Sequence, residues 1–447
     1  MKKTIKIYAA IRLISLAFMG IVYAAQGHED FIDEVTDHRH IMVVPTNTIE
    51  DEFKQNTPSQ FSPSTNFKEQ NKHPVRVLSL GGGGARGVGS AEILCVLEAY
   101  IYRATGKKLH EFFDVIVGTS TGGIQAIGLG MGLPATELRD LYQTETRQIF
   151  KQNGWGQWLF GGIWGPTYST NGLRETIEKH MGHKTLSEVK THVAVTVYDD
   201  RNERAHLLTN QMPGEGPIDY ARTDLPAGNL NIIDAAEATA AAPTYFAKKI
   251  ISEGDFLGNQ NSSSAAHHYV DGGITANDPA ALAKTFAQRL LKKGAFDEFY
   301  SNEIQLVSIG TGHEDPIVFN DNAGIFGFGS PGNIPSYFMN GAEAAVHALL
   351  AEEMQEGENY FHVQFSLPHK IPLDTVDEKV LNLVVQRAHA ATETDYFNKM
   401  VEVLCEKSIS EILNFSAQNK VPQLLRTQTP LEPMIPIKRG QFIEVAA

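Results

Sequence analysis

Two short glycine-rich segments constrain the fold of this chain more than any other feature. The first, 81–87, directly follows the largely apolar run 75–80, and the second, 118–122, directly follows the run 114–117. Each predicts a strand, a tight turn and a helix, because glycine permits the sharp backbone turn that an apolar run of strand length needs at its end. Ser120, at the centre of the second segment, would therefore stand exposed above the end of a sheet.

Ser120 is the candidate nucleophile. Gly118 and Gly122 stand two residues before and after it, where they relieve the crowding of a strained turn. The other glycine segment leaves backbone N–H groups uncovered by side chains, and such groups can stabilise the oxyanion that forms when a serine attacks an ester carbonyl. The candidate oxyanion hole consists of Gly82, Gly83 and Gly84.

Strand-like and helix-like segments alternate from residue 75 onward. Strands are predicted at 75–80, 114–117, 192–198, 268–271 and 304–309, a hairpin partner at 204–208, and helices at 88–105, after Ser120, and at 134–150, 233–242, 341–354 and 379–407. Asp278, Pro279 and Gly294 supply the cap, first-turn proline and C-terminal glycine of one more helix. This alternation predicts an α/β protein with a parallel sheet covered on both faces.

A serine hydroxyl needs a neighbouring base before it can act as a nucleophile. Asp271 ends a predicted strand and precedes Gly272-Gly273, so apolar surroundings would raise its proton affinity; the alternative is an Asx turn that caps the strand. His313 follows a later strand in the chain order of an α/β-hydrolase. However, His313 is next to Glu314 in a polar loop, and most single histidines in such loops are solvated surface residues rather than catalytic bases.

Three motifs in this order resemble the hallmarks of the patatin-like phospholipase family: 81–87, Gly-Thr-Ser-Thr-Gly at 118–122, and Asp-Gly-Gly at 271–273. The segments 238–246 and 276–279 also resemble stretches that this family carries before and after its aspartate. The resemblance covers the hallmark region 81–280 and extends to the flanking core strands. It implies a three-layer α/β/α patatin-like fold with a mainly parallel central sheet, to which a C-terminal helical extension would be added.

The resemblance also implies a chemistry. Ser120 would be the nucleophile and Asp271 the base of a Ser-Asp dyad, with residues 82–84 as the oxyanion hole and with no cofactor or metal. The implied function is that of a lipid acyl hydrolase of the phospholipase A or lysophospholipase type, which cleaves carboxylic esters through an acyl-enzyme intermediate. Arg86 has two interpretations, a role in positioning the glycine loop or meeting a phosphate, and an ordinary ion pair.

Two other functions compete with this one. A catalytically inactive lipid-binding protein could carry the same motifs, because motif presence does not prove turnover. A dinucleotide-binding oxidoreductase is suggested by Gly82, Gly84 and Gly87, which satisfy G-x-G-x-x-G between a strand and a helix. That function requires an acidic residue at the end of the second strand, where this chain has Val117-Gly118 instead.

Composition limits the partners. The 38 basic and 52 acidic residues give a formal net charge of −14, which argues against nucleic acid and against electrostatic binding to an anionic membrane. Contact with lipid would then be apolar. Trp155, Trp158 and Trp164, with the stretch 325–329, are candidates for a lid or interfacial loop, or for core packing. A protein activator is left open.

The chain divides into four predicted parts. Residues 1–25 have the basic start and apolar stretch of a signal peptide, so we expect export or secretion; an uncleaved N-terminus that anchors the protein in a membrane is the alternative. Residues 26–73 form a polar linker. Residues 74–372 form the catalytic domain, and residues 373–447 form C-terminal helices and a proline-containing tail.

Overall fold

The structure is a computed structural model that describes residues 72–152, 165–214, 218–258, 265–314 and 333–418. The predicted signal peptide, almost all of the linker, the three tryptophans, the stretch 325–329 and the tail after residue 418 lie outside the described residues. The predictions that concern those segments remain predictions.

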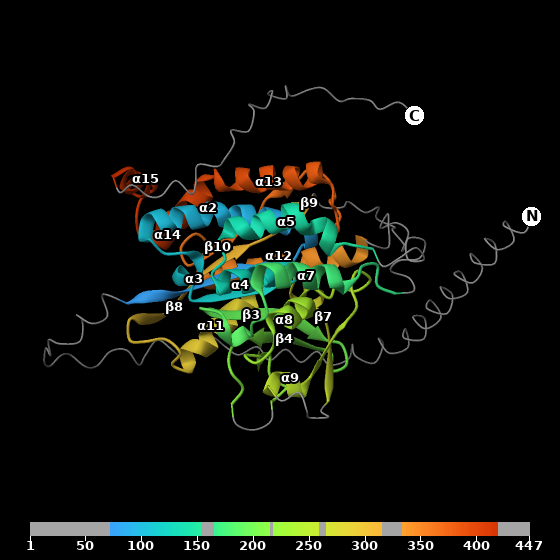
Figure 1. Ribbon diagram of the computed structural model, residues 1–447. Helices are drawn as coiled ribbons and strands as arrows, with labels where there is room; N and C mark the ends of the chain where they lie inside the picture. The colour runs from blue at the N-terminus through green and yellow to red at the C-terminus, as the bar shows by residue number, and fades with distance from the viewer. Residues whose placement is uncertain (1–71, 153–164, 215–217, 259–264, 315–332, 419–447) are drawn as a thin grey trace, which may run out of the picture. The chain divides into compact units, whose positions relative to one another are not determined.

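A nine-stranded sheet forms the centre of the described part of the chain, in the order β10-β8-β1-β2-β3-β4-β5 with β7 and β6 branching from β3 (Figure 1). The strands are β1 (His73–Leu80), β2 (Val115–Thr119), β3 (His192–Asp199), β4 (Arg204–Thr209), β5 (Asp224–Pro226), β6 (Lys249–Ser252), β7 (Ala266–Asp271), β8 (Tyr300–Ile309) and β10 (Tyr360–Val363). The pairs of β1 with β2 and β8, of β2 with β3, of β8 with β10 and of β4 with β5 are parallel. The predicted mainly parallel sheet is thus confirmed, and β4 forms the expected antiparallel hairpin with β3.

Apolar side chains cover both faces of this sheet. In β1, Val75 and Val77 join the core beneath α11 (Ala280–Lys292), whereas Leu78 and Leu80 join the core on the opposite face. Buried parallel strands require this arrangement because helices cover them on both sides. Figure 1 shows α2 (Gly87–Thr105), α5 (Ala135–Ile149) and α13 (Glu378–Thr392) stacked on one side and α11 on the other. This is the expected three-layer α/β/α arrangement.

Along one edge of strand β3, the pairing changes from parallel to antiparallel. Its first part pairs in parallel with β2, ending at Thr119 opposite Thr196. Its last part pairs instead with β7, which runs antiparallel and places Asp271 opposite Val197. The ends of β2 and β7 therefore meet beside consecutive residues of β3. Residues far apart in the chain are brought together by this register alone.

Helices continue beyond the sheet, with two differences from the sequence-based expectation. The helix predicted at 341–354 begins earlier, as α12 (Asn333–Met354). The single helix predicted at 379–407 is wrong: α13 ends at Thr392 and α14 (Asp395–Cys405) starts afresh, because the Thr394 hydroxyl accepts a hydrogen bond from the Phe397 N–H and caps it. A short α15 (Ile409–Gln418) follows. Within the described residues, no helix combines the length and apolarity needed to span a bilayer.

A substitution of Phe286 tests the packing of the core beneath α11. It lies on α11 against β1 and β8 and is 1% exposed, so Phe286→Ala should lower the free energy of unfolding by about 3–5 kcal/mol. Phe299→Ala is the matched control, because Phe299 is 61% exposed and its loss should change stability by less than about 0.5 kcal/mol. Urea denaturation measures both. Equal effects of the two substitutions would contradict this packing.

Candidate active site

Ser120 occupies the strained turn between β2 and α4 (Thr121–Met131). Its φ is 54°, a left-handed backbone conformation that a residue with a side chain adopts at a cost of about 1–3 kcal/mol. The flanking glycines are required by close packing: a Cβ on Gly118 would lie 2.1 Å from the Gly122 carbonyl oxygen, and one on Gly122 would lie 2.2 Å from the Leu80 carbonyl oxygen. The predicted nucleophile elbow is therefore the geometry that the chain adopts.

Three buried threonines hold this turn in place. The Ser120 backbone N–H donates to Thr239 Oγ1 at 2.9 Å, and the Thr239 hydroxyl donates to the Thr196 carbonyl at 2.7 Å. The Thr196 hydroxyl donates to Thr119 Oγ1, and the Thr119 hydroxyl donates to the Ala276 carbonyl, both at 2.7 Å. The chain of bonds links the turn to β3 and to the segment after β7.

Asp271, the candidate base, lies at the end of β7, beside Ser120. Its side chain is buried, and its Oδ1 accepts a hydrogen bond from the Gly273 N–H at 2.7 Å. Burial raises the pKa of Asp271 to about 6, even though hydrogen bonds from the Ser120 hydroxyl and the Gly273 amide act to lower it. The Ser120 hydroxyl thus lies close enough to the Asp271 carboxylate to influence its ionisation.

The glycine loop passes beside the elbow. A Cβ on Gly82 would lie 3.4 Å from the Ser120 Cβ, which places the loop directly against the candidate nucleophile. Gly83 packs so closely on Thr311 that a Cβ would lie 2.1 Å from its hydroxyl. Gly84 has a φ of 57°, which glycine adopts readily. Larger residues would displace the loop.

The three predicted oxyanion donors differ in whether their N–H groups already have a hydrogen-bond acceptor. The Gly82 N–H donates to the Asn277 carbonyl at 2.9 Å, and this bond would have to break before Gly82 could meet an oxyanion. Among the described residues, the N–H groups of Gly83 and Gly84 have no hydrogen-bond acceptor. Gly83 and Gly84 are therefore the better placed donors.

Asn277 and Thr239 are site residues whose roles the sequence did not reveal. Besides binding Gly82 through its carbonyl, Asn277 places its Oδ1 2.6 Å from the position of a Cβ on Gly82 and 3.4 Å from that on Gly273. Its side chain thus lies between the glycine loop and the turn after Asp271. Both residues fall within segments that resemble the family, but a sequence resemblance does not show which hydrogen bonds they make.

Arg86 and His313 each had two interpretations in sequence, and both contact residues that belong to neither candidate catalytic group. Arg86 Nη1 forms an ion pair with Glu314 Oε1 at 3.2 Å, which supports the second of its two interpretations. His313 is exposed at the edge of the molecule, and its Nε2 lies 3.3 Å from Ser366 Oγ. The fold therefore brings Asp271, and not His313, to the end of the sheet where Ser120 lies.

The raised pKa of Asp271 predicts that Asp271→Asn stabilises the fold. A rise from 3.8 to about 6 means that ionising this buried carboxyl costs the native state on the order of 3 kcal/mol at neutral pH. Native Asp271 binds its proton more tightly than unfolded Asp271 does, so the wild type loses this stability as pH rises from about 4 to 6, whereas the variant does not. Urea denaturation at pH 4 and pH 7.5 should show the advantage of the variant at pH 7.5 only.

The exposed Asp140 supplies the control for this prediction, since Asp140→Asn should change stability little at either pH. An Asp271→Asn variant that is less stable than the wild type at pH 7.5 would contradict the burial argument.

Comparison with known proteins agrees with the motifs. Residues 78–284 match the family model "Patatin-like phospholipase". A cGAMP-activated phospholipase of Escherichia coli (strain TW11681) is 33% identical over 55% of this chain and 64% of its own length, and one of Vibrio cholerae serotype O1 is 29% identical over 74% of this chain and 94% of its own length. Patatin-like protein 2 of Arabidopsis thaliana is 30% identical over 54% of this chain and 60% of its own length. The chain thus spans under two thirds of two of these three relatives. The resemblance is confirmed: residues 78–284 form a patatin-like phospholipase domain.

Proposed function

We propose that this protein is a lipid acyl hydrolase that cleaves carboxylic esters with Ser120 as nucleophile and Asp271 as base. The observation that carries the proposal is that Ser120 lies beside Asp271, a buried carboxyl whose burial raises its pKa to about 6. A carboxylate with raised proton affinity is a stronger base than an exposed one. It is still mostly ionised at neutral pH, as a base must be.

In the first half of the reaction, Ser120 Oγ attacks the ester carbonyl carbon while its proton passes to Asp271. The carbonyl oxygen becomes negative and is met by backbone N–H groups of Gly83 and Gly84. The positive end of the α4 dipole, which begins at Thr121, acts in the same direction. Cleavage of the ester C–O bond then expels the alcohol, which takes the proton from Asp271 and leaves an acyl-serine.

Water completes the cycle. Asp271 accepts a proton from the water molecule as its oxygen bonds to the acyl carbon, and the resulting intermediate expels Ser120, which regains the proton. The fatty acid is released and both residues return to their starting states. One carboxyl thus serves both halves, first as base and then as acid in each.

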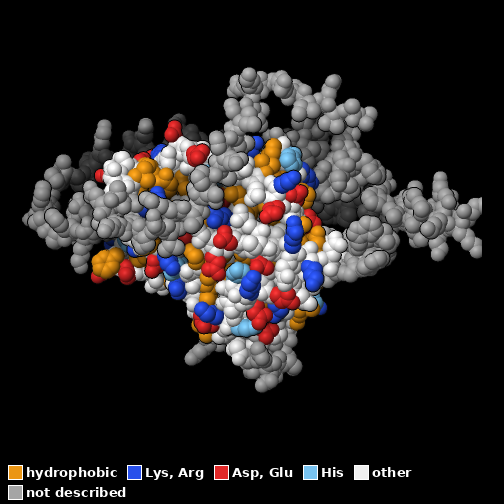
Figure 2. Space-filling model, turned by 45° about the horizontal axis from the view of Figure 1, so that its top comes forward, with side chains coloured by type: hydrophobic (Ala, Val, Ile, Leu, Met, Phe, Trp, Pro, Cys, Tyr) orange, Lys and Arg blue, Asp and Glu red, His pale blue; other side chains and the backbone are white. Residues whose placement is uncertain are grey.

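A lipid substrate fits the surroundings of the site. Ile274, directly after the Asp271-Gly272-Gly273 turn, is 49% exposed, and the methyl end of Met339 from α12 lies 3.6 Å from the position of a Cβ on Gly273. Both can contact an acyl chain. On the face shown in Figure 2, acidic and basic side chains are interspersed, so apolar contact rather than bulk charge would hold the lipid.

Control by a small molecule is a second part of the proposal. Two relatives are named for activation by cGAMP, and the match to the Vibrio cholerae protein covers 94% of its length, more than the catalytic domain alone. We therefore include cGAMP in the assays below. A rate of hydrolysis that rises with cGAMP supports activation of this protein by cGAMP. An equal rate with and without cGAMP means that only the catalytic reaction is shared with those relatives.

The direct test uses purified protein, with and without cGAMP, on defined phospholipids, lysophospholipids and neutral glycerides, and identifies the products by mass. The wild type should release fatty acid, and Ser120→Ala and Asp271→Asn should each lose activity by at least about a thousandfold. Asp140→Asn should behave as the wild type. A wild type that binds lipid but releases no fatty acid either with or without cGAMP would instead identify the inactive lipid-binding alternative. Full turnover by Asp271→Asn would refute the dyad.

The rate should also depend on pH in a defined direction. Because Asp271 must be ionised and its pKa is raised to about 6, kcat/KM should be constant at neutral pH and fall about tenfold for each pH unit well below 6. Initial rates on a soluble short-chain ester between pH 4.5 and 8, with folding checked at each pH, measure this. A rate that stays constant down to pH 4.5 would contradict Asp271 as the base.

A further inference from the structure

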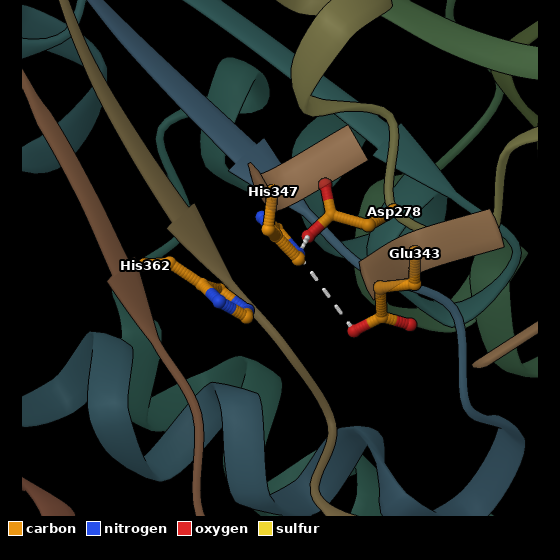
Figure 3. Close-up of side chains that lie close together, drawn as sticks. All are labelled: Asp278, Glu343, His347 and His362. Carbon is orange, nitrogen blue, oxygen red and sulfur yellow. Dashed lines mark ion pairs between the residues drawn. The ribbon is translucent and has the colours of Figure 1, made fainter. Parts of the chain in front are cut away.

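A second cluster of titratable side chains lies beside the candidate active site and takes no part in the proposed reaction. It consists of Asp278, Glu343, His347 and His362, whose potential ligand atoms all lie within 4.8 Å of one another. Figure 3 shows the four side chains converging from different elements: Asp278 from the segment before α11, Glu343 and His347 from α12, and His362 from β10.

We propose that these four side chains bind a divalent transition-metal ion of the zinc type, which ties α12 to the sheet. Two imidazole nitrogens and two carboxylate oxygens form a ligand set that suits zinc, whereas calcium and magnesium prefer oxygen ligands only. The number of ligands matches a closed structural site. The proposal departs from the sequence analysis, which expected no metal.

Two distances within the cluster are close to those around one shared ion. His347 Nε2 lies 3.2 Å from Asp278 Oδ2 and 3.8 Å from Glu343 Oε1. Tetrahedral zinc with bonds of about 2.0–2.2 Å separates its ligand atoms by roughly 3.3–3.6 Å. The ring of His362 stacks on that of His347, with centroids 3.5 Å apart, so His362 would have to rotate its ring to supply the fourth ligand.

One nitrogen atom in the cluster lacks a polar partner. Nε2 of His362 is buried and has no hydrogen-bond partner among the described residues, whereas Nε2 of His347 faces Asp278 Oδ2 at 3.2 Å. Buried polar atoms are nearly always paired, and an unpaired one calls for a specific explanation such as an absent ion. A metal ion bonded to this nitrogen would supply that partner.

The charge of the cluster also favours a cation. Asp278 is almost fully buried and Glu343 is mostly buried, so two carboxylates with neutral histidines leave two negative charges in a poorly solvated place. A divalent ion makes the group neutral.

Hydrogen bonds from surrounding groups orient two of the candidate ligands, as is usual for metal ligands in proteins. Asp278 Oδ1 accepts hydrogen bonds from the Ala280 N–H at 2.8 Å and from Ser79 Oγ at 3.2 Å, and its Oδ2 accepts one from Ser308 Oγ. His347 Nδ1 bonds to the Tyr360 hydroxyl. Such bonds fix the ring so that Nε2 faces the centre of the cluster.

The position of the cluster suggests what the ion would do. Asp278 directly follows Asn277, whose carbonyl accepts the Gly82 N–H. The Asn277 side chain also lies 3.5 Å from Glu343 Oε2. An ion held by Asp278 and Glu343 would therefore fix the segment against which the glycine loop rests, without touching the reacting atoms.

Metal binding tests the proposal without any activity assay. Untagged protein is stripped with EDTA, dialysed and titrated with Zn²⁺ against a chromophoric chelator. We expect one ion per chain with a dissociation constant below about 1 μM, a higher melting temperature with Zn²⁺, and a visible Co²⁺ spectrum of tetrahedral nitrogen–oxygen coordination.

Variants identify the ligands. His362→Gln and Glu343→Gln should each weaken Zn²⁺ binding by about a hundredfold or more, whereas His313→Gln, which alters an exposed imidazole outside the cluster, should bind as the wild type does. If His362→Gln fails to fold, Glu343→Gln and the Co²⁺ spectrum of the wild type decide. No binding tighter than about 10 μM, or binding that both variants retain, would overturn the proposal and leave the cluster as an internal ion pair only.

Discussion

The pairing of β3 with two different strands is the constraint on which the candidate active site depends. Thr196 pairs with the last residue of β2, and Val197 pairs with Asp271 at the end of β7. Ser120 follows β2 directly, so the serine and the carboxylate meet because two strands of opposite direction end beside neighbouring residues of a third. A shift of one residue in either pairing would turn the side chains to opposite faces of the sheet.

The free-energy costs of backbone strain at Ser120 and of the buried charge at Asp271 are offset by the packing around them. Ser120 adopts a left-handed backbone conformation, and Asp271 is ionised at neutral pH in a place that disfavours its charge. The threonine hydrogen bonds and the close packing at Gly118 and Gly122 hold the turn in this conformation. Enzymes commonly give up stability where their chemistry requires a strained or poorly solvated group.

Much of this arrangement follows from the sequence, because glycine requirements and apolar runs are local signals. The elbow at Ser120, the strands on either side and the Asp271 turn were all predicted from such signals. The engagement of Gly82 with Asn277, the support from Thr239, and the association of Asp278 with His347 and His362 depend on contacts between distant segments. Asp278 has the pattern of a helix cap in sequence, and only the fold shows its histidine neighbours. The break at Thr394 was missed although a threonine followed by aspartate is a local capping signal.

The proposed chemistry depends on the activation of Ser120 by Asp271. A fluorophosphonate reagent, which forms a covalent bond with an activated serine, followed by peptide mass spectrometry, measures this directly. We predict a single modified residue, Ser120, in the wild type at neutral pH, and modification slowed by at least about a hundredfold in Asp271→Asn. Modification of another residue, or an equal rate in the two proteins, would contradict the central claim.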